Sequence, residues 1–439
     1  MEDGANTFAP PLPLAALGPG LLCSLGLLWI LLHRIQGRAT PFLIAAIMLR
    51  VLFDAAPAYS IRPLVAGLTA NALLSVATAG IGFLLIDRRL LALRALWPLY
   101  LLVFAIVLSA ALNGPDAAAL QVLVKMAYFA VLTLTALQAF QENGAALTMK
   151  LVAAAFAPAL LFLLLSLATG TANESPTDGS RAFIGGFNHE SIFSLVLAAM
   201  LLALCFATDM RRGLRLLAMI AVIGGLALAN YRTVIIGLAP LLLIETFAAI
   251  MTSMPRRQRA LPLLAAFGLF AIGAGTILID PGERFEAAVD MVTNPAELIR
   301  PPEQFTLEER RFASARAYVW SQYWYGFTGG TTAEKTFGNG ADSWEGQFKV
   351  YAQNTFLSYL YEFGIFGTVA VMLLLIGMAF PAFAARGLMK WRLLAAHAGF
   401  LLVNLSTMPF WIIEGLIFYA LLFALSLHYG QRGRTSTER

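Results

Sequence analysis

The stretch LVAAAFAPALLFLLLSLAT, residues 151–169, contains no charged side chain. A helix of this length rises far enough to cross the hydrocarbon core of a bilayer, where only helices and closed barrels satisfy the backbone. Its apolar residues are continuous rather than alternating with polar ones, which is typical of a helix and not of a barrel strand. The stretch therefore predicts a membrane-spanning helix.

Similar stretches recur along the chain from Leu14 to His428. Hydrophobic residues make up 59% of the 439 residues and charged residues only 13%, which is far from the balance of a soluble domain. We therefore predict an all-α polytopic membrane protein with about 13 transmembrane helices, in a range of about 11–14. The expected spans are 14–32, 41–56, 64–86, 92–112, 117–140, 150–169, 189–208, 214–230, 232–252, 261–279, 353–384, 391–409 and 412–429.

The basic residues predict the orientation of these spans. With the N-terminus outside, the cytoplasmic connections and the C-terminal tail carry more than half of the 30 lysines and arginines, as the positive-inside rule requires. The basic excess thus marks cytoplasmic loops and not a nucleic-acid partner. The start, MEDGANTFAPPLPLAALG, has no basic segment before its apolar run, so we expect the first helix to be retained.

Three regions follow from this pattern. Residues 1–279 hold the first ten transmembrane helices, and residues 353–439 hold the last ones with a cytoplasmic tail. Residues 280–352 form one large outer loop, which mixes charged and aromatic residues. Because such a composition is not that of a disordered linker, we expect short helices in this loop.

Several cations fall within or beside the outer halves of the spans. Arg232 lies in LALANYRTVIIGLAP (226–240), between two apolar runs, and Arg50 and Lys125 lie inside spans. Charged residues at such positions are costly and often functional. Structural roles remain open: Arg50 and Asp54 have the i, i+4 spacing of an ion pair, Lys125 can snorkel, and Arg232 can end a helix at the interface.

The large loop contains an aromatic segment. Residues 307–327 are expected to form a helix with Arg316, Trp320 and Trp324 on one face and Tyr323 in the same aromatic cluster. These rings can stack on sugars, or they can form an interfacial belt.

Two polar segments flank the return of the chain to the membrane. KTFGNGADSW (335–344) carries Gly338 and Gly340, whose amides can approach an anion, although a simple turn explains them equally. Gln353 then begins an apolar helix, where it can hydrogen-bond a ligand or cap the helix.

A second outer loop, residues 169–194, carries Arg181, His189 and Glu190 to the mouth of a span. A histidine can take or give a proton near neutral pH, but it can also lie at the surface or cap a helix.

Four motifs in order resemble the bacterial O-antigen ligase and Wzy-type polysaccharide polymerase superfamily. They are GGFNHESIF at the start of a span, NYRTVIIG at the outer end of a helix pair, RAYVW followed by FGNG in the large loop, and QNTFLSYLYEFGIFG at the return to the membrane. The resemblance covers about residues 181–370, and its specificity lies in the order of the motifs.

This resemblance implies a glycosyltransferase of the bacterial inner membrane that works at the periplasmic face, with its N-terminus periplasmic and its C-terminus cytoplasmic. The donor would be an oligosaccharide on undecaprenyl diphosphate, and Arg232 and Arg316, with Arg181 and Lys125, would hold the diphosphate. Guanidinium groups match phosphate oxygens and stabilise the charge that grows on the leaving group. No metal or other cofactor would be needed. The implied glycan-binding residues are Trp320, Tyr323, Trp324 and Asn354.

The same resemblance implies partners: a lipid-linked donor, a lipid-linked acceptor, membrane lipids, a chain-length regulator and a flippase. Ligases of the superfamily carry a histidine where this chain has Gln353, followed here by Asn354. Glutamine cannot accept a proton, so Gln353 can orient the acceptor but cannot act as general base. This difference favours a repeat-unit polymerase over a ligase, and it leaves His189, Glu190 and Asp342 as candidates for the base.

Three other functions compete with polymerisation. The first is a ligase that transfers the glycan to a lipid A-core or another acceptor. The second is a lipid-linked sugar flippase or another transporter. Glu245 and Glu414, within or near spans, support this function, but the two halves show no internal repeat. The third is a scaffold subunit of a polysaccharide export complex.

Overall fold

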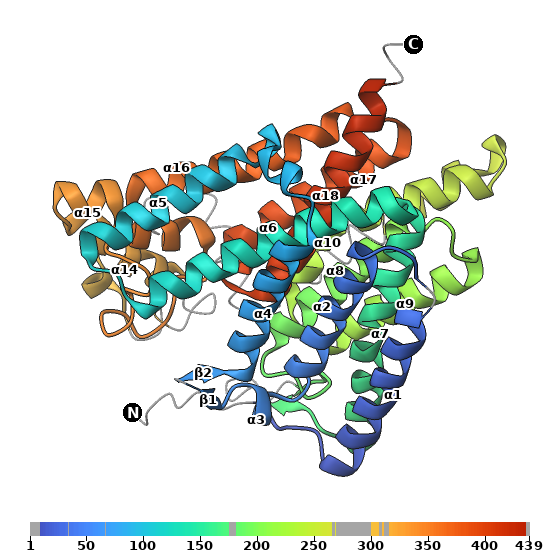
Figure 1. Ribbon diagram of the computed structural model, residues 1–439, viewed down its shortest axis with the longest axis horizontal. Coiled ribbons are helices and arrows are strands. Elements are labelled where there is room, and N and C mark those ends of the chain that lie inside the picture. Colours follow the sequence, from blue (N-terminus) through green and yellow to red (C-terminus); the bar gives the residue numbers. More distant parts are fainter. Residues whose placement is uncertain are drawn as a thin grey trace. The chain divides into compact units, whose positions relative to one another are not determined.

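The computed structural model describes residues 9–33, 35–65, 67–174, 181–265, 268, 300–306, 310 and 316–435. Helices dominate this part of the chain, and two short antiparallel hairpins accompany them (Figure 1). The chain divides into two compact units. Unit 1 comprises Met1–Ala92, Ala127–Ile235 and Ile412–Arg439, and unit 2 comprises Leu93–Met126 and Ile236–Trp411.

Unit 1 contains most of the N-terminal half of the chain and its last helix. Its helices are α1 (Leu14–His33), α2 (Ala39–Asp54), α3 (Pro57–Ser60), α4 (Ala70–Leu85), η1 (Arg88–Ala92), the second part of α6 (Ala117–Asn143), α7 (Ala145–Thr169), α8 (Glu190–Phe206), α9 (Arg212–Leu228), the first turn of α10 (Arg232–Ser253) and α18 (Ile413–Thr435). Its strands are β1 (Pro63–Val65) paired with β2 (Leu68–Thr69), and β3 (Asn173–Glu174) paired with β4 (Arg181–Ala182).

Helix α8 forms the core of unit 1. All residues from Phe193 to Phe206 are buried, and α7, α9 and α18 pack against this helix. A helix that is apolar on all sides needs protein or lipid around its whole circumference. Hydropathy cannot tell these two surroundings apart, and in α8 the covering is protein.

The predicted span over residues 64–86 is only partly helical. Its first residues form the β1–β2 hairpin, and α4 begins at Ala70. The Thr69 hydroxyl accepts the amide proton of Ala72 at 3.1 Å, which caps this helix. The expectation of one continuous span is therefore wrong here, because a hairpin followed by a capped helix leaves α4 with 16 residues.

Unit 2 contains the helices that surround the return of the chain to the membrane. They are η2 (Arg94–Leu96), α5 (Trp97–Asn113), the first part of α6, most of α10, η3 (Arg256–Gln258), η4 (Pro302–Gln304), α14 (Arg316–Gly329), α15 (Thr332–Phe337), α16 (Thr355–Ala384), α17 (Gly387–Ser406) and η6 (Pro409–Trp411). Helix α16 packs against α5, α14, α15 and α17. The short helices η4, α14 and α15 lie in the region expected to form the large outer loop.

Small residues let α10 and α17 approach closely. A Cβ on Gly399 would lie 1.9 Å from the carbonyl oxygen of Gly237. Contacts between glycines are a common way to pack helices within a membrane. Further along the same two helices, Glu245 and Arg392 form an ion pair in which Nη2 donates to Oε2 at 2.8 Å.

Seven helices of the described residues are long and apolar enough to cross a membrane. They are α1, Arg94–Asn113, α6, α7, α10, α16 and Ile413–Gly433 in α18. The chain is thus a polytopic helical protein, but the expected count of about 13 spans is not confirmed. Helices α2, α4, α8, α9 and α17 lie on further predicted spans without meeting the same criteria. The predicted span over residues 261–279 lies almost wholly outside the described residues.

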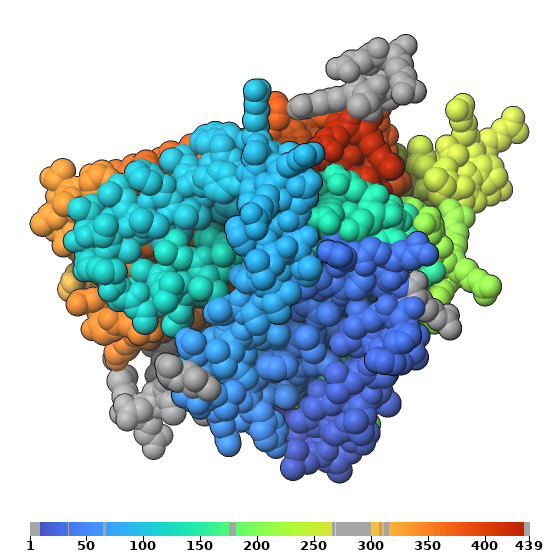
Figure 2. Space-filling view, viewed as in Figure 1, coloured from blue at the N-terminus to red at the C-terminus, as the bar shows by residue number. Residues whose placement is uncertain are grey.

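Large apolar side chains cover the outer faces of several spans. On α1, the dark blue surface in Figure 2, Leu22 is 71% exposed and Trp29 is 66% exposed. A water-soluble protein rarely exposes apolar side chains in such numbers, whereas a lipid-facing helix requires them.

Candidate functional site

Helix α16 is broken at Gly364, whose φ of 67° lies in the left-handed region. Such a break leaves backbone carbonyls without their helical partners. The carbonyl of Tyr361 accepts the amide proton of Asn339 at 3.1 Å, and the carbonyl of Glu362 accepts that of Gly340 at 2.9 Å. The segment that follows α15 is therefore held directly on the break.

Gly338 marks the closest approach of this segment to α16. A Cβ at this position would lie 2.2 Å from the carbonyl oxygen of Glu362, and the φ of Gly338 is +83°. We expect Gly338→Ala to lower the free energy of unfolding by about 2 kcal/mol or more, because backbone must move and the left-handed conformation becomes strained. Thermal unfolding of the purified protein measures this loss.

Gly346→Ala is the matched control for that variant. Gly346 also has a positive φ, +80°, but no atom lies within 4 Å of its would-be Cβ. It therefore carries the conformational strain without the clash, and we expect a smaller loss of stability. Equal losses for the two variants would contradict a role for close packing at Gly338.

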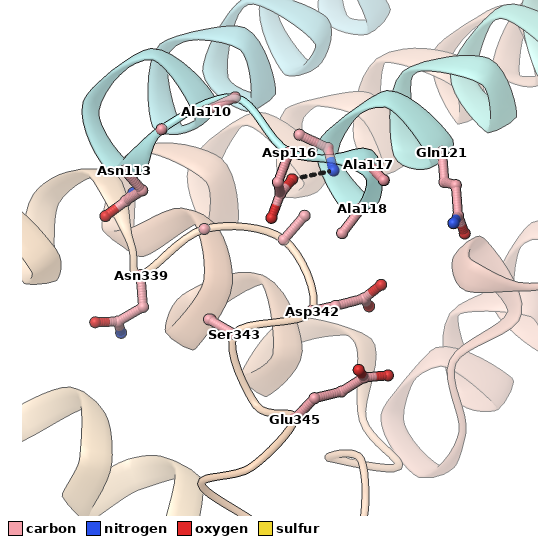
Figure 3. Close-up of a pocket in the computed structure, with 14 residues that line it drawn as sticks. Ala110, Asn113, Asp116, Ala117, Ala118, Gln121, Asn339, Asp342, Ser343 and Glu345 are labelled. Atoms are coloured by element: carbon pink, nitrogen blue, oxygen red, sulfur yellow. Dashed lines mark hydrogen bonds between the residues drawn. The ribbon is translucent and has the colours of Figure 1, made fainter. Parts of the chain in front are cut away.

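A polar pocket of about 500 Å³ lies between the turn from α5 to α6 and residues 339–345, all within unit 2 (Figure 3). Three carboxylates and three side-chain amides line it among small residues. These polar residues are Asp116, Asp342, Glu345, Asn113, Gln121 and Asn339. Of these, only Asp342 was among the site residues expected from the sequence.

Asp342 has a fixed and strained backbone. Its φ is 52°, and its amide proton is donated to Oε2 of Glu362 at 2.8 Å. Figure 3 shows the carboxylates of Asp342 and Glu345 extending in the same direction from their loop. Asp116 lies on the other wall, where its Oδ1 accepts the amide proton of Ala119 at 2.8 Å and caps α6.

Glu362 supports the pocket from within α16. Its side chain is fully buried, and the hydroxyl of Ser358 donates to its Oε1 at 2.5 Å. Lys125 lies within electrostatic range of this carboxylate, and its Nζ is 5.7 Å from the ring centroid of Trp411. Lys125 follows Gln121 of the pocket by one helical turn. The expected contact between Lys125 and a diphosphate remains a prediction.

Tyr323 belongs to the core beneath this region. It is 1% exposed, and its ring lies 4.5 Å from that of Phe348 and 5.5 Å from that of Tyr361. Burial raises the pKa of the Tyr323 phenol above its ordinary value, and negative charge at Glu362 raises it further. A ring closed off in this way supports the wall of the region, and a sugar cannot stack on it without a rearrangement.

The other two aromatic candidates lie on α14. The indole of Trp320 is half-buried and donates to the carbonyl of Ala352 at 3.0 Å, which anchors the residue before Gln353. Trp324 is 38% exposed. Arg316 begins α14 with a half-buried side chain. Most of residues 307–315, where the expected helix was to begin, lie outside the described part of the chain.

Gln353 and Asn354 differ in their freedom to bind a ligand. Asn354 caps α16: its Oδ1 accepts the amide protons of Phe356 at 2.9 Å and Leu357 at 3.2 Å, and its Nδ2 donates to Leu405 at 3.0 Å. These bonds use both acceptor positions of Oδ1 and one of the two N–H groups of Nδ2. Gln353 is in the left-handed region, with a φ of 50°.

Three non-glycine residues of the described chain have a positive φ: Asn230, Asp342 and Gln353. This conformation is uncommon for residues with a side chain, least so for Asn and Asp, and such strain often lies at functional sites. Two of the three were expected at the site, and the third lies two residues before Arg232.

Arg232 is the first residue of α10, and its side chain is exposed. Among the described residues, it forms no ion pair or hydrogen bond through its guanidinium. The first turn of a helix also presents free amide protons and a positive partial charge. Arg232 therefore has an uncommitted cation at a helix end that favours anions.

His189 and Glu190 lie at the start of α8. The Nδ1 atom of His189 accepts the amide proton of Ser191 at 3.0 Å, so it carries no proton, although Oε2 of Glu190 is 3.6 Å away. We favour the hydrogen bond over an ion pair, because an amide can only donate. Glu190 accepts a hydrogen bond from Asn173, and the ring of Tyr231 lies 6.3 Å from that of His189.

Arg181 is paired with a carboxylate. In the β3–β4 hairpin its Nη2 lies 2.8 Å from Oε1 of Glu174, and both side chains are exposed. Arg181, His189, Glu190 and Arg232 belong to unit 1, whereas the remaining candidates belong to unit 2.

Asp116, Glu345 and Glu362 are parts of the site that were not predicted from the sequence. Two signals were available. Asp116 directly follows the Asn-Gly-Pro turn between two apolar runs, and Glu362 is an acidic residue within an apolar helix. Within the described ranges, no three histidine, cysteine or acidic side chains are arranged to hold a metal ion.

No protein-family model matches the chain, and no curated protein matches it either. The length and hydropathy of the helices nevertheless decide the class of the molecule. The chain is a multi-pass helical membrane protein.

Proposed function

We propose that this protein is a glycosyltransferase that polymerises oligosaccharide repeat units carried on undecaprenyl diphosphate. In this proposal the pocket around Asp342 receives the acceptor sugar, and arginines hold the diphosphate of the donor. The pocket is the observation that carries the proposal, and the ordered sequence motifs support it. The enzyme would lie in the bacterial inner membrane with its site facing the periplasm.

The chemistry of the pocket fits a sugar. Sugar hydroxyls need several acceptors and donors in a small space, and carboxylates with amides are such partners. The carboxylates of Asp116, Asp342 and Glu345 would repel a diphosphate, so the donor headgroup needs cationic side chains of its own. Arg232, with its uncommitted guanidinium at a helix N-terminus, has the properties that a diphosphate requires.

The reaction can be written with these groups. The Asp342 carboxylate accepts the proton of the acceptor hydroxyl, whose oxygen forms a bond to the anomeric carbon of the donor. The bond between that carbon and the phosphate oxygen breaks, and undecaprenyl diphosphate leaves with the electron pair. Guanidinium groups stabilise its charge. Gln353 orients the acceptor but cannot take the proton.

A polymerase is preferred to a ligase because of Gln353. At the position where ligases of the resembled superfamily carry a histidine, this chain has Gln353. The acceptor in a polymerase is another lipid-linked repeat unit, and a carboxylate such as Asp342 then supplies the base.

The product of the purified protein tests the proposal. The protein is reconstituted into liposomes without an ion gradient and is given a lipid diphosphate-linked repeat unit, with or without a lipid A-core acceptor. Mass spectrometry is expected to detect chains of two or more repeats on the lipid in both reactions. A product only with lipid A-core would indicate a ligase, and no glycosidic bond in either reaction would contradict glycosyl transfer.

A further inference from the structure

Arg50 of α2 is buried in unit 1 among polar groups from its own helix and two others. Its Nε donates to Oε1 of Glu414 at 2.6 Å and lies 3.1 Å from Oδ2 of Asp54. Its Nη1 reaches the hydroxyl of Ser75 at 3.4 Å, and Nδ2 of Asn71 donates to Oδ1 of Asp54 at 3.3 Å. Arg50 and Asp54 come from α2, Asn71 and Ser75 from α4, and Glu414 from α18. We call these five residues the Arg50 cluster.

The charges of the Arg50 cluster do not balance if both acids are ionised. One guanidinium faces two carboxyl groups, and Asp54 and Glu414 lie within hydrogen-bonding range of each other. Two buried carboxylates cannot stay in such contact unless a proton lies between them. The nitrogen Nε has one proton, which it directs to both acids, and the bond to Glu414 is the shorter one, at 2.6 Å against 3.1 Å, which favours Glu414 as the charged acceptor. Glu414 is thus the ionised partner of Arg50.

Two buried oxygens at the Arg50 cluster have no hydrogen-bond partner. They are Oε2 of Glu414 and the phenolic oxygen of Tyr128 on α6, both on side chains that are 1% exposed. Tyr128 lies within electrostatic range of Arg50, Asp54 and Glu414. A buried carboxylate oxygen without a donor is costly, and a proton on Asp54 adds the donor that this group lacks.

We infer that Asp54 retains its proton at neutral pH and donates it to Glu414, so that the Arg50 cluster is a proton-binding site inside the membrane protein. Asp54 is then a neutral acid, and Arg50 with Glu414 is a balanced pair. Tyr128 offers a hydroxyl beside this proton. The inference does not depend on glycosyl transfer.

Unit 2 provides a contrasting pair. Glu245 pairs with Arg392, whose Nε and Nη2 both donate to its carboxylate, and among the described residues no second acid pairs with Arg392. One positive charge meets one negative charge there, so no proton is required. Neutralising Glu245 should leave Arg392 charged and unpaired, whereas neutralising Glu414 leaves Arg50 beside Asp54, which must then lose its proton to balance the guanidinium.

Three variants test the inference: Asp54→Asn, Glu414→Gln and the control Glu245→Gln. Asparagine resembles a protonated aspartic acid, so Asp54→Asn is expected to melt within about 2 °C of the wild type. Glu245→Gln strands a buried arginine and should lower the melting temperature by roughly 5–10 °C, whereas in Glu414→Gln the retained Asp54 can ionise and pair with Arg50, which should limit the loss. An Asp54→Asn protein as unstable as Glu245→Gln would contradict the assignment of the proton to Asp54.

Infrared spectroscopy of the full-length protein measures the proton directly. At neutral pH the wild type and Glu245→Gln are expected to show the carbonyl stretch of a protonated carboxyl group, which shifts in heavy water and is lost in Asp54→Asn. The difference between the wild-type and Asp54→Asn spectra removes the contribution of other buried acids such as Glu362, and a difference spectrum without such a band overturns the inference. This readout needs no substrate, so it is independent of the proposed enzyme activity.

Discussion

Arg232→Ala is expected to abolish polymer formation while the protein still inserts and folds. Arg232 is the first residue of α10, and its side chain is exposed and makes no ion pair with the described residues. Removal of this side chain should therefore leave the packing intact. If it stabilises the charge on the departing diphosphate, its loss should lower the turnover rate by on the order of 10²–10³. The measurement is the rate of glycosidic bond formation by purified protein of wild-type melting temperature.

Two further variants make this prediction specific. Arg232→Lys should recover only part of the rate, because an ammonium is a point charge that cannot bind two phosphate oxygens as a guanidinium does. Arg62→Ala is the matched control: Arg62 is also exposed and also lies in a short connection predicted to be on the outer side. Normal polymer from Arg232→Ala, or an equal loss from Arg62→Ala, would remove the diphosphate role.

Hydropathy predicted the class of the fold because every segment that crosses a bilayer must be apolar and must satisfy its own backbone hydrogen bonds. Residues 151–169, quoted at the start, lie within α7, and most predicted spans coincide with helices. The number of spans was harder to predict. The α8 helix is as apolar as a lipid-facing one but is covered by protein, and the sequence before α4 forms a hairpin. Whether an apolar segment faces lipid or protein depends on its packing partners, which the local sequence does not reveal.

The pocket could not have been predicted from spacing. Asp116 and Asp342 are far apart in the chain but line the same pocket. The segment that carries Asp342 is held there because α16 breaks at Gly364 and the freed carbonyls of α16 accept hydrogen bonds from Asn339 and Gly340. Glycine inside an apolar run permits such a break without requiring it. Asp342 itself was named as a candidate base, but nothing in its local sequence predicted a pocket shared with Asp116 or a hydrogen bond to Glu362.

Packing also decided which aromatic residues of α14 are available. Helical periodicity placed Arg316, Trp320 and Trp324 on one face and Tyr323 beside them. Tyr323 instead fills the core with Phe348, and the indole of Trp320 holds a backbone carbonyl. A ring that stacks on sugar and a ring that fills a core have the same sequence signal, because both are large and apolar.

Asp342→Asn should reduce kcat by roughly 10²–10⁴ with little change in KM, because the amide keeps the shape of the side chain and one acceptor oxygen but cannot take up a proton. Glu345→Gln is the matched control from the same loop and the same pocket. If Glu345 only binds the acceptor sugar, that variant should raise KM and leave kcat nearly unchanged.

The backbone of Asp342 permits one more variant. Because its φ is 52°, Asp342→Gly fits the same conformation and opens space for a small external base. Added formate should then restore part of the rate of Asp342→Gly and none of the rate of Arg232→Ala, since only the first lacks a proton acceptor. An Asp342→Asn enzyme with more than about half of the wild-type kcat would rule out general-base catalysis by this carboxylate, because the amide has no basicity near neutral pH. The pocket would then remain a binding site for the acceptor, and the proton would have to leave by another group.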